Sequence, residues 1–263
     1  MRVKDFNNLK TMKVSVKDGI AELEFCRPEK LNSMNACFWR EFPEVLHTID
    51  SEAAARVIIL CAQGRHFTAG MDLEIFQHML STFKEDPARR AEQLRRGILE
   101  LQKSFSLMEQ IRMPVIACVQ GACVGGGVDL ICGADIRYCT TDAMFTIKET
   151  ELGITADVGT LQRLQYVMPS GLARELAYTS RPMDAQEAIS CGFINQVFEH
   201  PSAMMEAVRR IAAQIAMNSP VAVHGTKVML NHSRDHSLSD SLEYVATWQA
   251  GMLQQEDLKE AVQ

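Results

Sequence analysis

Two apolar segments constrain the fold more than any other feature of the sequence. They are residues 56–62 (RVIILCA) and 114–120 (PVIACVQ). Neither alternates between apolar and polar residues, and both are rich in β-branched side chains, so each predicts a strand buried on both faces. Residues 135–141 and 144–147 predict two further strands. Strands of this kind occur almost only in parallel sheets covered by helices, so we predict an α/β fold.

The remaining segments predict how this core is extended. Residues 12–16 and 20–25 alternate around Lys17-Asp18-Gly19 and predict a β-hairpin. Periodic apolar positions predict helices at about 35–49 and 89–112, and helices almost throughout after about residue 159, apart from a short strand at 194–198. Residues 237–262 predict one long amphipathic helix. We therefore divide the chain into an α/β core, residues 1–197, and a helical C-terminal region, residues 198–263.

Charge and cysteine usage limit the classes of partner and compartment. The net charge of −6 disfavours a nucleic-acid or anionic-membrane partner, and an anionic substrate would need a local basic patch. Gln120, Asp129 and Asp135 interrupt the longest apolar stretches, so no membrane span is expected. Eight cysteines without a CxxC pair indicate free thiols in a reducing compartment. With no secretory or peroxisomal signal seen, a bacterial-type cytoplasmic location is favoured over the mitochondrial matrix or the peroxisome.

A glycine-rich loop follows each of the two buried strands. The loops are residues 64–73 (GRHFTAGMDL) and 121–130 (GACVGGGVDL). Glycines between a strand and a helix let backbone N–H groups approach a ligand closely, although a plain tight turn is the alternative. The second loop has neither the GK[ST] of a phosphate-binding loop nor GxGxxG spacing. Nucleotide hydrolysis and nicotinamide binding are therefore not supported.

Acidic residues gather in and after the second loop: Asp129 lies in the loop, and Glu149, Glu151 and Asp157 follow it. Asp129 lies in an apolar segment (GGGVDLICGA), where a carboxylate is costly to bury without a partner. Such a cost often marks a functional residue. The alternatives are that Asp129 caps a helix or forms a salt bridge with Arg137.

Two other candidate chemistries are not supported by the sequence. His232 and His236 have the i, i+4 spacing of metal ligands, but no third ligand or catalytic glutamate lies between them, so we predict a solvated helix face and no metal site. No serine lies in a GxSxG motif, so a hydrolase triad is not expected.

Three blocks of the sequence resemble signature blocks of the crotonase, or enoyl-CoA hydratase/isomerase, superfamily. They are FTAGMDL (67–73), VQGACVGGGVDLICGADIRYCT (119–140) and TSRPMDAQEAISCGFINQV (179–197). The resemblance extends over the chain from about residue 12. Within the family, residues 148–164 (KETELGITADVGTLQRL) and 219–254 are most similar to Δ3,5-Δ2,4-dienoyl-CoA isomerases. Generic hydratases have a Pro-Glu pair and a Gly-rich turn without an acid here, whereas this chain has Lys148-Glu149 and Asp157.

The resemblance implies a crotonase-type spiral of repeated ββα units with a helical C-terminal region that drives assembly into trimers or hexamers. It implies that the backbone N–H groups of Met71 and Gly126 form an oxyanion hole for a thioester carbonyl, and that Asp129, Glu149 and Asp157 are the catalytic acids. Residues 68–72 would line the adenine and pantetheine track, and Lys30 lies in a loop near the expected entrance. The expected substrate-binding residues are Lys30, Thr68, Ala69, Gly70, Met71, Asp72 and Gly126.

The expected reaction converts a 3,5-dienoyl-CoA to a 2,4-dienoyl-CoA in fatty-acid β-oxidation, with no cofactor beyond the coenzyme A of the acyl-CoA substrate. Glu149 would remove the C2 proton and Asp157 would protonate C6, or the reverse, with Asp129 tuning the pair. One alternative is a 2-enoyl-CoA hydratase in which Asp129 and Glu149 hold a water molecule. Another is a catalytically silent, RNA-binding protein of the same fold, which the mixed charges of residues 85–112 disfavour.

Overall fold

Within residues 2–262, six strands form one sheet in the order β1-β2-β3-β4-β6-β9. The computed structural model describes these residues, apart from the side chains at positions 4, 76, 79, 80 and 261. β1 and β2 pair antiparallel around Asp18 and Gly19, which both have positive φ, and the other neighbours pair parallel. The predicted hairpin and α/β fold are thus confirmed. The strands are β1 (Met12–Lys17), β2 (Ile20–Phe25), β3 (Val57–Ala62), β4 (Val115–Val119), β6 (Ile136–Thr140) and β9 (Gln196–Phe198).

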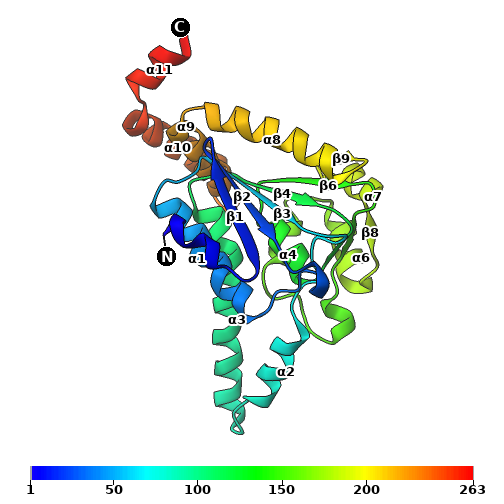
Figure 1. Ribbon diagram of the computed structural model, residues 1–263. Helices are drawn as coiled ribbons and strands as arrows, with labels where there is room; N and C mark the ends of the chain where they lie inside the picture. The colour runs from blue at the N-terminus through cyan, green and yellow to red at the C-terminus, as the bar shows by residue number, and fades with distance from the viewer. Residues whose placement is uncertain (1, 263) are drawn as a thin grey trace.

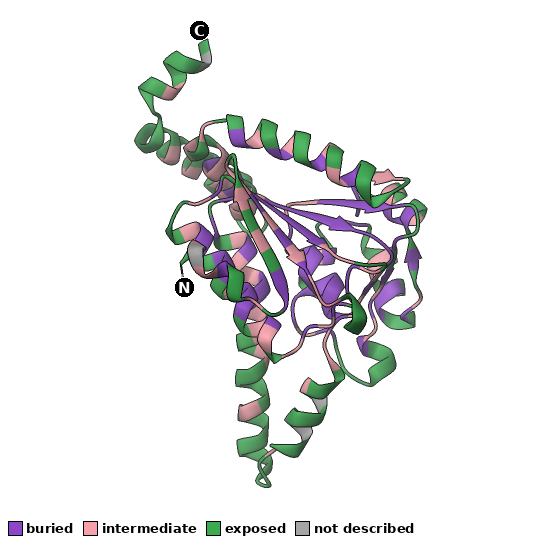
Figure 2. Cartoon of the chain, viewed as in Figure 1, coloured by how far each residue is buried: buried purple, intermediate pink, exposed green. Residues whose placement is uncertain are grey.

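Helices cover both faces of this sheet, which explains why its central strands are apolar throughout (Figures 1 and 2). Successive side chains of a strand point to opposite faces. In β3, Ile58 and Leu60 join the main core, whereas Val57 and Ile59 pack with Val208 of α8 (Pro201–Met217). The main core includes residues of α1 (Ala36–Ser51) and α3 (Pro87–Gln110). Each buried strand therefore needs apolar residues at consecutive positions.

A second, three-stranded sheet was not foreseen as a separate layer. It has the order β5-β7-β8 among the described residues, formed by β5 (Ala122–Val124), β7 (Met144–Thr146) and β8 (Met183–Asp184). The second glycine-rich loop, predicted as one loop over residues 121–130, contains β5 and the start of a helix. That helix, α4, is buried over its whole length. The remaining core elements are η1 (Val3–Asn8), η2 (Pro28–Lys30), α4 (Gly126–Cys132), η3 (Glu149–Leu152), α5 (Thr160–Leu164), α6 (Ser170–Thr179) and α7 (Ala185–Ser190).

One helical hairpin projects from the body (Figure 1). It consists of α2 (Leu73–Ser81), which was not predicted, and the first half of α3. Among the described residues of α3, the buried ones are Ser104, Phe105 and Met108, all in the second half of the helix. The second half of α3 is therefore fixed against the core.

The C-terminal region differs from its prediction in one respect. The single helix expected over residues 237–262 is two helices, because Leu253 has an extended backbone and ends α10. No described residue of α10 is buried, and its apolar residues Leu238, Leu242 and Met252 are exposed. The predicted division of the chain into two regions at residue 197 stays a prediction. α8 lies after this boundary but packs on the sheet of the predicted core. The helices are α9 (Pro220–His232), α10 (Leu238–Met252) and α11 (Gln255–Val262).

Two findings bear on compartment and membrane contact. The eight cysteines, all within the described residues, are free. Over residues 2–262, none of the helices has both the length and the apolar character that crossing a bilayer requires.

A buried lysine joins α9 to the core. The Nζ atom of Lys227 donates hydrogen bonds to the carbonyl oxygens of Met108 (2.5 Å) and Met113 (2.8 Å) and to Oδ2 of Asp135 (2.9 Å). Desolvation lowers the pKa of Lys227, while Asp135 raises it. A buried ammonium is tolerated because each of its three donors has an acceptor.

We predict that Lys227→Met lowers the free energy of unfolding by about 3 kcal/mol, since it leaves two carbonyls without their donor and the partly buried carboxylate of Asp135 without its charged partner. The measurement is the melting temperature at a fixed protein concentration. Lys259→Met in α11 is the matched control, because Lys259 is exposed and pairs with Glu256 within its own helix. Equal effects of the two substitutions would show that Lys227 does not anchor α9.

Candidate functional site

The two glycine-rich loops lie against each other. Thr68 and Cys123 form a parallel bridge, in which Thr68 N donates to the carbonyl of Ala122 and Val124 N donates to the carbonyl of Thr68, both at 3.1 Å. The side chain of Gln120 joins the strand ends by donating to Ala62 O at 2.7 Å. The loops, which are about 50 residues apart in the sequence, therefore contribute to one site.

Two backbone N–H groups are left free beside this bridge. Met34 N donates to Gly70 O and Asp72 N donates to Met34 O, so the intervening Met71 directs its own N–H away from Met34. Gly126 opens α4, where a helical N–H has no partner within the helix. Neither N–H has an acceptor among the described residues.

Two glycines keep the space between these N–H groups open. A Cβ atom on Gly126 would lie 3.6 Å from Met71 N, so a side chain there would fill the space beside both donors. Gly70 has a φ of +84°, and a Cβ on it would lie 2.4 Å from the carbonyl oxygen of Val124. Paired backbone donors of this kind can stabilise an oxygen that gains negative charge during a reaction.

The predicted acids come together from three different segments. Asp129 is in the first turn of α4 and 1% exposed, and its Oδ1 accepts a hydrogen bond of 2.6 Å from Thr160 N. Glu149 opens η3 and is buried, and its Oε2 has no hydrogen-bond partner among the described residues. Asp157 is half-buried in the turn between η3 and α5.

Glu149 lies next to the N–H pair. Its Oε1 is 3.2 Å from the position that a Cβ on Gly125 would occupy, and Gly125 directly precedes Gly126. The short helix η3 that contains Glu149 is fixed to α6, because Thr150 Oγ1 donates to Ala177 O at 2.6 Å. The carboxyl group of Glu149 is thus held beside the free donors.

Burial raises the pKa values of all three acids, and repulsion by neighbouring acids adds to the shifts of Glu149 and Asp129. For Glu149 desolvation is the largest cause and the charge of Asp129 the next, and together they raise its pKa to about 7. Desolvation raises the pKa of Asp129 to about 6, although the hydrogen bonds from Thr160 oppose this. Desolvation also raises the pKa of Asp157. Near neutral pH such a cluster can both accept and hold a proton.

The structure bears on the two alternative readings of Asp129, while its catalytic role stays a prediction. Asp129 is not the N-cap of α4, which is Gly125, but its carboxylate accepts the N–H of Thr160, the first residue of α5. It also forms no ion pair with Arg137 within the described residues, since the Arg137 guanidinium donates to the carbonyls of Phe193, Ile131 and Ala134. The fourth predicted acid, Glu151, is exposed and pairs with Lys148, away from the cluster.

The predicted substrate-binding residues are placed around the first loop. Lys30 is exposed at the end of η2. Thr68 is fully buried, and its hydroxyl donates to Asn32 O. The Asp72 carboxylate accepts a hydrogen bond from Ser33 Oγ at 2.8 Å, which is the largest cause of its lowered pKa, and lies 3.7 Å from Arg27. The side chains of Thr68 and Asp72 therefore hold the loop, and their contact with a substrate stays a prediction.

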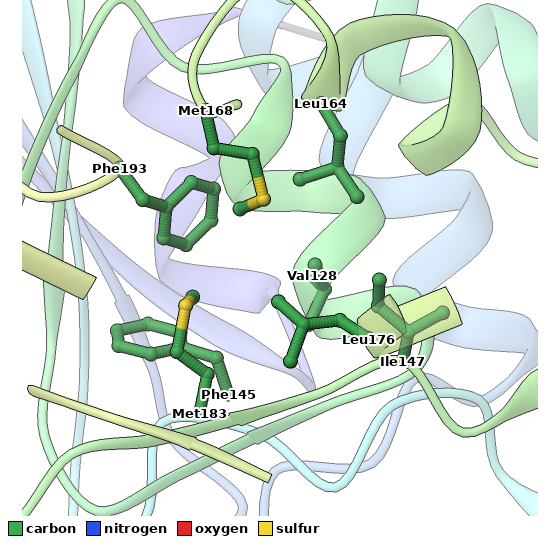
Figure 3. A pocket seen from close by; sticks show the side chains of 8 residues that line it. All are labelled: Val128, Phe145, Ile147, Leu164, Met168, Leu176, Met183 and Phe193. Carbon is green, nitrogen blue, oxygen red and sulfur yellow. The ribbon is translucent and has the colours of Figure 1, made fainter. Parts of the chain in front are cut away.

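Residues that are close to the acids in the sequence line an apolar cavity (Figure 3). Its volume of about 10 Å³ is room for roughly one water molecule. Val128 precedes Asp129 in the chain, Ile147 lies two residues before Glu149, and Leu164 is in the helix that begins at Thr160. The lining residues are Val128, Phe145, Ile147, Leu164, Met168, Leu176, Met183 and Phe193.

Sequence reasoning missed the residues that hold the acids in place. The donor to Asp129 is the backbone N–H of Thr160, 31 residues away, and a backbone donor leaves no signal in residue type. Thr150 bonds to α6 across 27 residues, and no local pattern indicates that contact. Gly125 was the one residue whose type indicated that another group, here Glu149, approaches the backbone closely. Its φ in the structure is +52°.

Comparisons with known proteins show the family of the chain. Residues 15–263 match the family model described as Enoyl-CoA hydratase/isomerase. The chain is 43% identical over 263 residues to the mitochondrial Delta(3,5)-Delta(2,4)-dienoyl-CoA isomerase of Mus musculus, covering 99% of this chain and 80% of that protein. It is 42% identical to the peroxisomal protein of the same name in Arabidopsis thaliana, covering 100% and 95%.

Solved structures show the same fold. A putative enoyl-CoA hydratase from Streptomyces coelicolor A3(2) superposes with a TM-score of 0.88 at 28% identity, covering 96% of this chain and 90% of that one. A putative enoyl-CoA hydratase from Thermobifida fusca YX in complex with CoA gives a TM-score of 0.83 at 23% identity, covering 95% of each chain. The predicted crotonase-type fold is thereby confirmed, and this chain belongs to the enoyl-CoA hydratase/isomerase family.

Proposed function

We propose that the chain is a Δ3,5-Δ2,4-dienoyl-CoA isomerase, which moves the two double bonds of a 3,5-dienoyl-CoA to positions 2 and 4. The observation that supports this most strongly is a third acid, Asp157, beside Asp129 and Glu149 in one desolvated cluster. Relatives named for this activity are 42% and 43% identical over nearly the whole chain. Hydration of a 2-enoyl-CoA needs no third acid.

The free N–H groups of Met71 and Gly126 would bind the thioester oxygen. A C2 proton is too weakly acidic for a carboxylate unless the dienolate formed by its removal is stabilised. Two backbone donors supply that stabilisation, and the loss of one such donor typically costs about 3 kcal/mol. The bridge between the two loops would hold both donors in position before the substrate reacts.

Two further carboxyl groups serve the two ends of the diene. C2 and C6 are four bonds apart along the chain, so acids from different segments suit them better than one acid. Glu149 is the proposed C2 base because it lies beside Gly125 and hence near the thioester oxygen site. Asp157 then delivers the proton to C6. The negative charge of Asp129 raises the pKa of Glu149 and helps to bring it to about 7.

The coenzyme A portion of the substrate is the proposed small-molecule partner, and the reaction uses no other cofactor. Its phosphates require local positive charge in a chain of net charge −6. Lys30 is exposed beside the first loop, whereas the nearby Arg27 is engaged with Asp72. We therefore assign Lys30 to the phosphates. Relatives with this function are named as mitochondrial and peroxisomal, and a bacterial-type cytoplasmic location stays a proposal beside them.

The proposed roles make the variants Glu149→Gln and Asp157→Asn differ in kind. Loss of the C2 base should abolish exchange of the C2 hydrogen with deuterated solvent, whereas loss of the C6 acid should leave some exchange. Product formation should fall by about 10²–10⁴-fold in each. The measurements are proton NMR of the exchange and ultraviolet absorbance of the 2,4-dienoyl product. An Asp157→Asn variant with full activity, or faster hydration of a 2-enoyl-CoA than isomerisation, would favour the hydratase instead.

The pH dependence follows from the raised pKa of Glu149. Glu149 must be ionised while Asp157 is protonated, so kcat/KM should follow a bell-shaped pH profile with one limb near 7 set by Glu149. Asp129→Asn removes a neighbouring negative charge, which lowers the pKa of Glu149 and should shift that limb to lower pH. Glu151→Gln removes one charge from the same short helix at an exposed site and should leave the profile in place. A profile that Asp129→Asn does not move would argue against coupling of the two acids.

We also propose that the chain assembles as a trimer or as a hexamer made of two trimers. The apolar residues Leu238, Leu242 and Met252 of α10 are 77%, 59% and 45% exposed, which is costly in water. Light scattering at micromolar concentration should give three or six times the mass of one chain. A stable monomer would contradict the assembly without bearing on the chemistry of the acids.

A further inference from the structure

The carboxyl group of Asp157 depends on its backbone for its position. Asp129 accepts a hydrogen bond from Thr160, and Glu149 is packed against Gly125. By contrast, the Asp157 carboxyl accepts no hydrogen bond from another residue within the described part of the chain. A side chain without such a tie follows every shift of its own backbone. Whatever fixes the turn around Asp157 therefore fixes this acid.

The second half of α3 fixes that turn through side chains. Gln102 Nε2 donates to the carbonyl oxygen of Asp157 at 2.6 Å, across 55 residues of sequence. Arg163 Nη1 donates to the carbonyl of Val158, and Arg163 Nη2 donates to Ser106 Oγ at 3.0 Å and Glu109 Oε2 at 2.6 Å. Two successive carbonyls of the turn are thus bound by side chains that belong to α3 or are held by it.

The two contacts differ in what they add electrostatically. Arg163 is charged and lowers the pKa of Asp129, so its removal would disturb the cluster directly. It also fills the space beside Gly159, where a Cβ would lie 1.8 Å from Arg163 Nη1. Gln102 is neutral and contributes position alone. It also lies two residues before the buried Ser104 and three before the buried Phe105, where α3 is fixed to the core.

We infer that Gln102 is a positioning residue for the reaction, which holds the Asp157 backbone so that the carboxyl group meets the far end of the diene. This inference rests on the proposed function of Asp157. Gln102 would contact no reacting atom, and its effect would pass through its hydrogen bond to the carbonyl of Asp157. Since a displacement of about 1 Å can cost up to 10²-fold in rate, one neutral hydrogen bond is enough to matter.

The test is Gln102→Met, which keeps the length of the side chain and removes the donor. The matched control is Gln110→Met, an exposed position at the end of the same helix. Gln102→Met should lower kcat about 10- to 100-fold with KM unchanged and with C2 exchange retained, because the oxyanion donors and Glu149 are untouched. Gln110→Met should match the wild type in all three measurements.

The same substitution in the Asp157→Asn background separates positioning from general damage. If Gln102 acts through Asp157, Gln102→Met should cause no further loss once the acid is gone. Should Gln102→Met fail to fold by circular dichroism, Gln102→Glu decides, since at pH 8 a carboxylate of nearly the same size cannot donate to the carbonyl.

Three results would overturn the inference. They are wild-type kcat in the folded Gln102 variant, a raised KM with unchanged kcat, and an equal loss in the Asp157→Asn background. The failure of the proposed function has a different signature. If Asp157→Asn itself kept full activity, the role of that acid would fall, and the inference about Gln102 would fall with it.

Discussion

The parallel pairing of β3 with β4 is the constraint on which the site depends. Ile58, Ile59 and Leu60 pair with Val115, Ile116 and Ala117, so both strands end at the same edge of the sheet. The two glycine-rich loops leave that edge side by side and pair through Thr68 and Cys123. A slip of one residue would turn every side chain of a strand to the other face, which the apolar packing on both faces forbids. The position of the N–H donors is therefore set by burial far from the chemistry.

The same burial creates the electrostatics of the acids. A carboxyl group in an apolar setting loses hydration, and a second one nearby adds repulsion, so both pKa values rise. Val128 and Ile147 line the apolar cavity and belong to the same short segments as Asp129 and Glu149. Core packing and the proposed proton transfer thus use adjacent residues, and a cavity-forming substitution there is expected to lower both the stability and the pKa values.

Periodicity and motifs predicted the elements better than their contacts. The buried strands were visible in RVIILCA and PVIACVQ because burial on both faces removes polar residues from the strand. The break at Leu253 was not predicted: Gly251, two residues before it, is the one local signal of a helix end, and the apolar positions continue into α11 without a proline. The three acids were found by residue type and resemblance. Gln102 and Thr160 were not, because hydrogen bonds to and from backbone atoms put no constraint on local sequence.

In the proposed mechanism, the turn at residues 153–159 is where the chemistry of this chain departs from that of its fold. The structure titled as a putative enoyl-CoA hydratase, at 28% identity, superposes with a TM-score of 0.88, so the arrangement of strands and helices does not by itself separate hydration from isomerisation. The oxyanion donors serve any reaction that begins by polarising the thioester carbonyl. A third acid changes the reaction only if its distance from the diene is held constant. A turn that contains two glycines, Gly153 and Gly159, would not hold that distance alone, and the side chains of Gln102 and Arg163 supply the rigidity that its own backbone lacks.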